Sequence, residues 1–500
     1  MVHIRTTKTG SNSTAVQVVR IEYGNTVIIK HIGSAKNEQE LILLKKQAEK
    51  YVSDYTGQFN LFNSSFGNRE SNYVFQSKHS RCIGIKYRLL YAVFQQLFSL
   101  LKFDQIKNQL LLDLVMMRLI EPSSKIQTIK LLEEIFEITY SKSNVFREIN
   151  SYSDLKEKVE EKVINFAKNN LSFDFTVVFY DVTTLYFESF KDDDFKKCGF
   201  SKDNKFNQPQ IVIGLIVNAN GFPISYDVYQ GNIFEGHTLI PILKKFKEKY
   251  KVDNLTVVAD AAMISKENIQ SLKDNNLNYI VGARISNLPF KLMKTISHKV
   301  YGIDGAICKE KTKYGHLICD FSQKRYLKNK YEMDSQITKA EKYLATPEKV
   351  TKRIKFLKNS DKTKVEINKG LIEKNTILLG IKGYYTNLDD IDNKTVIKLY
   401  HNLWNVEKAF RMAKSDLKTR PIYHRKEKTI KAHILICFMA LAVGEYIELK
   451  SKSSLQRVLK IMKTAVDVKI KDEATGQIIN IPTYLSTQLK TLLQKLNVTY

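Results

Sequence analysis

The sequence is poor in cysteine, and the cysteines it has are scattered. Only five of its 500 residues are cysteine, and no two are spaced as Cys-x-x-Cys. The sequence therefore predicts neither a disulfide framework nor a zinc knuckle, and the pattern fits a reducing compartment. We expect a cytoplasmic protein.

The sequence also lacks a signal peptide and a long hydrophobic run. The N-terminal segment Met1–Lys8 has no apolar core. The longest apolar run, Ile434–Gly444, is shorter than the roughly 20 residues that span a bilayer, so it predicts a buried helix. We expect a soluble protein with no membrane partner.

Acidic residues are too few to balance the basic ones. The chain has 79 Lys and Arg against 52 Asp and Glu, a formal net charge of +27. This excess favours a polyanionic partner, with nucleic acid first and an anionic membrane surface second. A hydrophobic fraction of 43% indicates a folded chain, and its length allows several domains.

The first third of the chain divides into a β-rich and a helical part. Within residues 1–80, the runs Val16–Ile21 and Thr26–Lys30 are joined by a turn sequence and predict an N-terminal β-hairpin, which a polar linker follows. Residues 81–172 have helical periodicity, and on so basic a chain we predict a helical DNA-binding region. A scaffold would give the same pattern, because no helix-turn-helix signature is evident.

From residue 173 to residue 285 the pattern is that of an α/β domain. Three apolar strands come in succession, and two further strands alternate with helices. The predicted strands span 175–181, 210–218, 224–229, 255–260 and 278–285. The order βββαβαβ is that of an RNase H-like catalytic core, and strands this apolar are usually buried on both faces of a sheet.

A Lys-rich segment, residues 286–373, interrupts this order, and its pattern predicts short strands mixed with a charged helical stretch from Gln336 to Phe356. The second part of the core would span 374–450, starting with an apolar strand at Asn375–Ile381 and continuing into a final helix. Residues 451–500 form a C-terminal region to which the sequence assigns no role.

Three carboxylates stand out by their context. Asp181 and Asp260 each end an apolar strand, where a charge is costly unless it meets water, a partner or a metal. The first and fourth strands of an RNase H-like sheet are adjacent, so both side chains emerge at one edge. A helix packed there through Leu403 and Val406 would bring Glu407 to them.

Three converging carboxylates suit two divalent ions about 4 Å apart. Oxygen ligands select Mg²⁺ or Mn²⁺ over zinc. The alternative is that Asp181 and Asp260 only make loop hydrogen bonds at their strand ends.

A second stripe on the Glu407 helix is aromatic and basic, and it predicts contacts with DNA. Trp404 could stack on an unpaired base, while the cations could bind phosphates; Arg284, at a strand end, is a further phosphate candidate. The alternatives are packing for Trp404 and a solvated face on which Glu407 pairs with Arg411. The predicted stripe comprises Tyr400, Trp404, Arg411, Lys414 and Lys418.

These residues resemble a known family, the DDE transposases of bacterial insertion sequences, in the branch with a Tyr-x2-Arg-x3-Glu-x6-Lys signature. Tyr400, Glu407 and Lys414 match the signature, whereas Leu403 stands at its Arg position. Arg411, one turn beyond the Glu, is a candidate for the missing cation.

The resemblance implies that Asp181, Asp260 and Glu407 are the catalytic and metal-binding residues, and that residues 286–373 form the β-rich insertion of this branch. It also implies cleavage of double-stranded DNA at terminal inverted repeats, joining of the 3′-hydroxyl ends to target DNA, and a homodimer on paired DNA ends. The setting would be the bacterial cytoplasm, in association with the nucleoid. Two other functions remain open, a structure-specific RNase H-like nuclease and a transposition repressor that binds DNA without cutting it.

Overall fold

The protein, described by a computed structural model, forms two compact units. One comprises Met1–Leu90 and Lys463–Ser486, and the other comprises Tyr91–Met462 and Thr487–Tyr500. The structure describes residues 2–10, 13–22, 25–56, 58–60, 74–76, 80–188, 191–200, 207–263, 265–345, 354–361, 364–472, 476 and 478–499.

The first unit contains a small α/β layer and a separate sheet. Strands β2 and β3 pair antiparallel where the sequence predicts two strands, and β1 extends that sheet on the other side of β2. Helix α1 packs on the sheet, with Val16, Val18 and Ala48 at the centre of the core. These elements span Val2–Lys8 (β1), Thr14–Glu22 (β2), Asn25–Ala35 (β3) and Glu38–Thr56 (α1).

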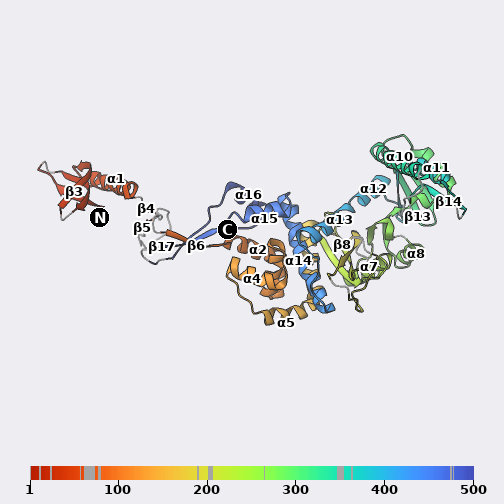
Figure 1. Cartoon of the computed structure of the whole chain (residues 1–500), viewed down its shortest axis with the longest axis horizontal. Helices are drawn as coiled ribbons and strands as arrows, with labels where there is room; N and C mark the ends of the chain where they lie inside the picture. Colours follow the sequence, from red (N-terminus) through yellow and green to blue (C-terminus); the bar gives the residue numbers. More distant parts are fainter. Residues whose placement is uncertain are drawn as a thin grey trace. The chain divides into compact units, whose positions relative to one another are not determined.

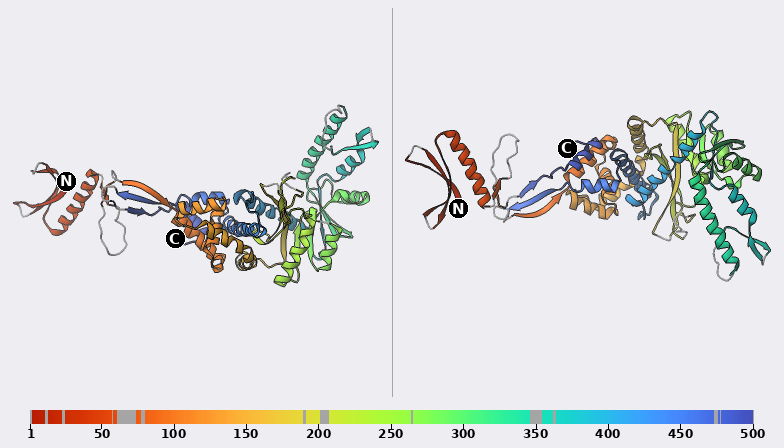
Figure 2. Two further views of the ribbon diagram at one scale, coloured as in Figure 1. Left: turned by 60° about the horizontal axis from the view of Figure 1, so that its bottom comes forward. Right: turned by 90° about the horizontal axis from the view of Figure 1, so that it is seen from above.

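The other sheet of this unit joins segments from both ends of the chain. Strand β17 (Asp467–Asp472) pairs with β6 (Ser80–Lys86) on one side and with β18 (Ile478–Ile481) on the other. Figure 2 shows the orange and blue strands side by side. Two short strands, β4 (Gln58–Asn60) and β5 (Val74–Gln76), form a separate pair.

Helices make up most of residues 81–172, which the sequence predicts to be helical, but the first residues of this range, to Lys86, belong to strand β6. A long apolar helix, α14 (Glu427–Ser451), packs against two of these helices, α3 and α5. Figure 1 labels α14 in blue beside the orange helices. The early helices span Arg88–Leu100 (α2), Gln109–Ile120 (α3), Lys125–Phe136 (α4), Lys142–Tyr152 (α5) and Lys156–Leu171 (α6).

Helix α14 is the one helix among the described residues that is long and apolar enough to cross a membrane. Its most apolar window is 94% buried inside the protein. It therefore forms the centre of a helical core, in keeping with the buried helix predicted at Ile434–Gly444.

The second unit is built around an eight-stranded mixed sheet of order β12-β13-β16-β11-β10-β7-β8-β9. Strands β7, β10 and β11 are parallel, and β8 and β9 continue from β7 as an antiparallel meander. The chain order βββαβαβ and the adjacency of the first and fourth strands are those predicted from the sequence. The five strands span Val177–Tyr186 (β7), Gln210–Val217 (β8), Pro223–Gln230 (β9), Thr256–Ala259 (β10) and Asn278–Ala283 (β11).

Helices cover this sheet and seal its apolar strands. Helix α7 (Gly236–Tyr250) packs against β8, β9 and α8 (Lys266–Asp274), while α6 and α14 pack against β9. All eight residues of β8 are buried. The near-continuous apolar runs of the sequence thus correspond to strands covered on both faces.

Residues 286–373 are richer in helix than a β-rich insertion would be. Strands β12 and β13 lengthen the main sheet through β16, and β14 and β15 form a hairpin, but three helices make up much of the rest. The elements from this segment through β16 span Phe290–Val300 (α9), Ile307–Thr312 (β12), Gly315–Phe321 (β13), Gln323–Ala345 (α10), Leu357–Asp361 (β14), Lys364–Ile367 (β15), Lys369–Ile377 (α11) and Ile381–Thr386 (β16).

The strand predicted at Asn375–Ile381 is wrong. Helix α11 continues to Ile377, and β16 begins only at Ile381. A short apolar run does not distinguish the end of a helix from a buried strand, because both present consecutive apolar side chains. After α14, helices α15 (Leu455–Met462) and α16 (Thr487–Lys495) close the second unit.

Candidate active site

Asp181 and Asp260 lie side by side on adjacent parallel strands. The last paired residues of β7 and β10 are Tyr180 and Ala259, so the two aspartates occupy the next positions on both strands. Asp260 is exposed and Asp181 is partly exposed. Neighbouring positions on parallel strands face the same side of a sheet, so both carboxylates lie at one edge.

Asp181 does not end its strand, contrary to the sequence prediction. Strand β7 continues to Tyr186 and pairs with β8 throughout this extension. Asp181 instead marks the point where β7 loses its parallel neighbour β10. The aspartate is accessible because the sheet narrows there, which a single strand's hydrophobic pattern does not reveal.

The predicted helix around Glu407 is divided into two helices. Helix α12 spans Asn393–His401, helix α13 spans Trp404–Arg411, and a π-helical turn follows at Met412–Asp416. Helix α13 packs against β7 and β8, whereas α12 packs against β10, β11 and β16. The pair therefore crosses the sheet beside both aspartates.

The apolar stripe predicted for this helix is the buried one. Leu403, Val406 and Phe410 are buried, whereas Glu407 and Arg411 are exposed. Packing through the apolar stripe thus presents Glu407 to solvent beside the sheet edge.

Tyr400 connects the helix pair to the aspartates. Its Oη donates a hydrogen bond to Asp260 Oδ1 over 3.2 Å. The ring lies directly against Gly282 of β11, where any Cβ would collide with the Tyr400 hydroxyl. Tyr400 is buried, so we assign it to positioning the Asp260 carboxylate and not to the DNA contact predicted from the sequence.

The charges of all three predicted carboxylates act on this phenol. Burial is the largest cause that raises the pKa of Tyr400, and the carboxylates of Asp260, Glu407 and Asp181 raise it further. An anion raises the pKa of a neighbouring phenol because it disfavours the phenolate. The Tyr400 hydroxyl is thus hydrogen-bonded to Asp260 and lies within electrostatic range of the other two acids.

The three acids do not form a finished three-ligand metal cluster. Among the described residues, no group of three His, Cys, Asp or Glu side chains lies close enough to hold a metal ion. Asp181 and Asp260 supply an adjacent pair of carboxylates, and Glu407 is the nearby third. Their oxygen ligands fit Mg²⁺ or Mn²⁺ in chemistry, since hard cations prefer carboxylates.

A cation that the sequence analysis missed, Lys382 of β16, also lies here. Its Nζ is 4.7 Å from the centroid of the Tyr400 ring. Burial is the main cause that lowers the pKa of Lys382 and nearby Arg325 lowers it too, whereas the carboxylates of Asp320, Asp260 and Glu407 act in the opposite direction. In the sequence, the feature that could have identified Lys382 is a lysine within an otherwise mostly apolar and aromatic strand.

The residues predicted to contact DNA differ in accessibility. Trp404 is 55% exposed, and Arg411 and Lys418 are exposed. Lys414 is partly buried and lines a small apolar cavity beneath its helix. Arg284 is exposed and lines two cavities next to residues 285–289.

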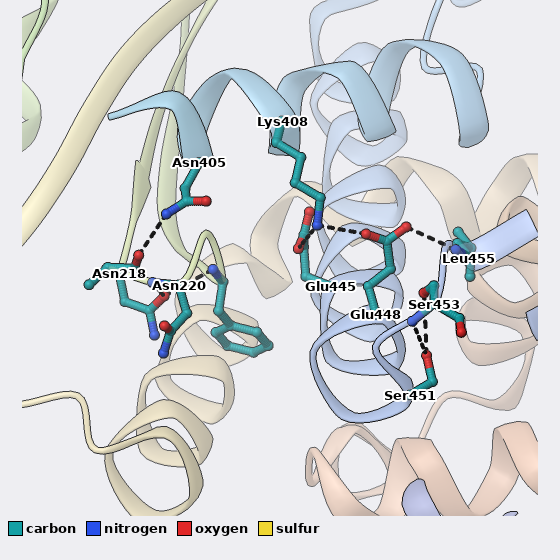
Figure 3. A network of polar contacts seen from close by, with 11 residues as sticks. Asn218, Asn220, Asn405, Lys408, Glu445, Glu448, Ser451, Ser453 and Leu455 are labelled. Atoms are coloured by element: carbon teal, nitrogen blue, oxygen red, sulfur yellow. Dashed lines mark hydrogen bonds and ion pairs between the residues drawn. The ribbon is translucent and has the colours of Figure 1, made fainter. Parts of the chain in front are cut away.

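Lys408, next to Glu407 in the sequence, is directed into the protein. Its Nζ lies 2.6 Å from Glu448 Oε2 and 3.6 Å from Glu445 Oε2, both on α14 (Figure 3). Asn405, one turn earlier, donates a hydrogen bond to the Ala219 carbonyl oxygen over 2.8 Å. These contacts fix α13 against its neighbours and leave the opposite flank, with Glu407 and Arg411, to solvent.

A comparison with known families identifies this arrangement. The model of the family described as "Transposase DDE domain" matches residues 172–443, more than half of the chain. The chain belongs to the DDE transposase family. The match runs from the end of α6 into α14, and so includes Asp181, Asp260 and Glu407 of this transposase.

The transposase is also similar to solved structures, at low identity. A piggyBac transposase synaptic complex with hairpin DNA has 10% identity and a TM-score of 0.37, over 83% of this chain and 75% of that chain. A Mos1 transposase paired-end complex with the left transposon end has 14% identity and a TM-score of 0.16, over 48% and 71%. TM-scores this low do not establish a shared overall fold. None of the curated proteins matches the sequence.

Proposed function

We propose that this transposase cuts DNA at the ends of its own element and joins the freed 3′-hydroxyl groups to target DNA. Asp181, Asp260 and Glu407 are the catalytic residues in this proposal. The observation that carries it is the side-by-side placement of the two aspartates on β7 and β10, with Glu407 near enough for its charge to act on the same tyrosine.

The three carboxylates would hold Mg²⁺ or Mn²⁺, in a two-ion arrangement. Bound ions of this kind make water or a 3′-hydroxyl more nucleophilic and stabilise the departing oxygen. Tyr400, which is hydrogen-bonded to Asp260, fixes the orientation of one ligand. Lys382 lies within electrostatic range of two of the three acids, Asp260 and Glu407, and can offset part of their charge.

The DNA partner follows from charge and from the exposed flank of α13. A net charge of +27 favours binding to a polyanion. Arg411 lies exposed one turn from Glu407, where it can contact a phosphate near the cut. We propose terminal inverted repeats and target DNA as the substrates and a homodimer as the form that holds paired ends.

The signature around Glu407 supports placing this transposase among those of bacterial insertion sequences. Tyr400, Glu407 and Lys414 keep the Tyr, Glu and Lys of the Tyr-x2-Arg-x3-Glu-x6-Lys pattern. Leu403, which replaces the Arg, is buried and belongs to the packing stripe. Arg411 is therefore our candidate for the missing cation, and the bacterial cytoplasm, at the nucleoid, is the proposed location.

The test is a comparison of binding and cutting on a labelled fragment that carries the element's terminal repeat. In Mg²⁺ or Mn²⁺ the wild type should nick the fragment at the repeat boundary, whereas Asp181→Asn should not. In Ca²⁺, Asp181→Asn should still bind the fragment, because neutralising a carboxylate beside phosphate does not weaken attraction to DNA. Asp192→Asn, in an exposed acidic loop, is the matched control and should cut normally.

Two results would overturn the proposal. A wild-type protein that binds the repeat tightly but never nicks it, with paired ends and either metal supplied, would be a repressor. Cutting that follows DNA structure regardless of the repeat sequence would indicate a structure-specific nuclease.

A further inference from the structure

A basic cavity lies apart from the three acids, between the start of helix α4 and the segment 418–424. Its volume is about 380 Å³, within the range of ligand-binding pockets. Among the described residues that line it, none is Asp or Glu. Its cationic and imidazole side chains are Arg118, Lys125, Lys418, Arg420, His424 and His433.

Lys125 is the decisive residue, because it is buried without a counterion. It is only 6% exposed, and within the described part of the chain it makes no hydrogen bond or ion pair. Burial lowers the pKa of Lys125 to about 7, and the neighbouring Arg118 contributes to the shift. An ammonium group buried beside a guanidinium is unfavourable unless an anion joins them.

The backbone at this place favours an anion too. Helix α4 has 12 residues and begins at Lys125, so its positive dipole end lies at the cavity wall. Ser124 accepts hydrogen bonds from the amides of Gln127 and Thr128, which leaves the two preceding amides without intrahelical partners. Helix starts with free amides bind phosphate groups in many proteins.

Arg118 and the histidines complete the wall. Arg118 Nη2 donates a hydrogen bond to the Ser123 carbonyl oxygen over 3.1 Å, which holds the guanidinium in place while other N–H groups remain. Burial lowers the pKa of His424 to about 4, with Lys125 and Arg118 as further causes, and burial also lowers the pKa of His433 well below its ordinary value. Both imidazoles are therefore neutral, and the charge of the cavity comes from its lysines and arginines.

We propose that this cavity binds one phosphate group of a DNA strand. That the phosphate belongs to DNA rests on the proposed function, whereas phosphate binding itself is inferred from the residues of the cavity. Glu407, Arg411 and Lys418 lie on one segment of the protein, and Lys418 is at the cavity wall. Arg411 and Lys418 are both exposed, so a DNA strand that leaves the active site along this segment would meet both. The helical region before the catalytic domain would thereby take part in holding DNA.

The experiment uses the full-length protein and a matched pair of variants on one helix. Lys125→Met removes the buried charge and keeps the length of the side chain, whereas Lys130→Met removes an exposed charge of the same helix outside the cavity. The first measurement is the thermal midpoint as inorganic phosphate replaces chloride at constant ionic strength. The second is affinity for the terminal-repeat fragment in Ca²⁺ across a range of salt.

For the wild type and Lys130→Met, phosphate should raise the thermal midpoint. Lys125→Met should unfold at a higher temperature without phosphate and gain little from it, because its buried charge is already gone. Its DNA affinity should fall about tenfold, the loss expected for one charged phosphate contact. Lys418→Ala, at the exposed rim, should show a smaller loss in the same direction.

Equal phosphate responses in Lys125→Met and Lys130→Met would overturn the proposal that this cavity binds phosphate. A lost phosphate response with unchanged DNA affinity would overturn the DNA assignment, because the pocket would then serve free phosphate. Failure of the wild type to nick repeat DNA refutes the proposed enzyme activity, but a phosphate response that depends on Lys125 would still support the pocket.

Discussion

The Tyr400 hydroxyl donates a hydrogen bond to Asp260 Oδ1 across 3.2 Å, and so joins helix α12 to the end of strand β10. The two residues are 140 positions apart in the chain, and their bond fixes one of the three acids relative to the helix that precedes the Glu407 helix. Its ring position depends on Gly282, which leaves room for the hydroxyl. The position of the Asp260 carboxylate therefore depends on two residues, Tyr400 and Gly282, that are not acids themselves.

Replacing Tyr400 by Phe tests this positioning role. The ring packing should survive, so we expect unfolding to become easier by only about 1 kcal/mol, the usual net contribution of a hydrogen bond. Cutting should fall roughly tenfold, and more Mg²⁺ should be needed for half-maximal rate, because Asp260 is no longer held. A reduced rate with unchanged Mg²⁺ dependence would argue that Tyr400 acts only through packing.

Substituting Gly282 by Ala should disturb the same bond from the other side. The added methyl group collides with the Tyr400 hydroxyl, so we expect a loss of about 1–3 kcal/mol in unfolding free energy, together with reduced cutting. In the double variant with Tyr400→Phe, the collision is partly relieved. The two stability losses should therefore sum to more than the loss of the double variant, which denaturant unfolding of all four proteins will measure.

How much of this site the sequence predicts depends on whether the partner of a residue is local. Asp181 and Asp260 are predictable because each follows an apolar run, and chain order places their strands side by side. The inward direction of Lys408 is not predictable, because its partners Glu445 and Glu448 lie on another helix. From the sequence alone, Lys408 resembles one more surface cation beside Arg411. Lys382 is missed for the same reason: its neighbour Tyr400 comes from a helix that packs onto the strand.

The same reasoning explains errors along the chain. The helical periodicity from Leu399 to Lys418 predicts correctly that Leu403, Val406 and Phe410 are buried. It does not reveal the break before Trp404 or the π-helical turn after Arg411. Asn375–Ile381 is ambiguous because its apolar residues suit either a helix end or a strand. Local pattern predicts which face is buried more reliably than where an element stops.

Arg411 and Lys408 test the difference between an exposed cation and one that is paired inside the protein. Arg411→Ala should weaken binding to the repeat fragment and lower the slope of log affinity against log salt by about one unit, because an exposed phosphate contact is lost. Lys408→Ala removes an equal charge, but its ammonium is paired inside the protein. It should leave the salt slope nearly unchanged and reduce stability instead. Equal slopes for Arg411→Ala and the wild type would indicate that this flank is an ordinary solvated surface and does not contact DNA.

Glu445 should give the fold a measurable dependence on pH. Burial raises the pKa of this fully buried carboxyl group from 4.5 to about 7, although Lys408 opposes the shift. Between these two values the folded protein holds a proton that the unfolded chain has lost, so stability is greatest below about pH 4.5 and declines until the pH passes 7. The shift corresponds to a decline of at most about 3 kcal/mol from this group.

Glu445→Gln should remove this decline, because an amide does not ionise and Lys408 keeps Glu448 as a partner at 2.6 Å. Denaturant unfolding of both proteins from pH 5 to pH 8 measures the effect as a gap that widens in favour of the variant as pH rises. Glu448→Gln is the control: it breaks the shorter ion pair and should destabilise the protein at every pH in this range. A constant difference between Glu445→Gln and the wild type would mean that Lys408 holds Glu445 ionised throughout, and the buried network would then be a permanent ion pair.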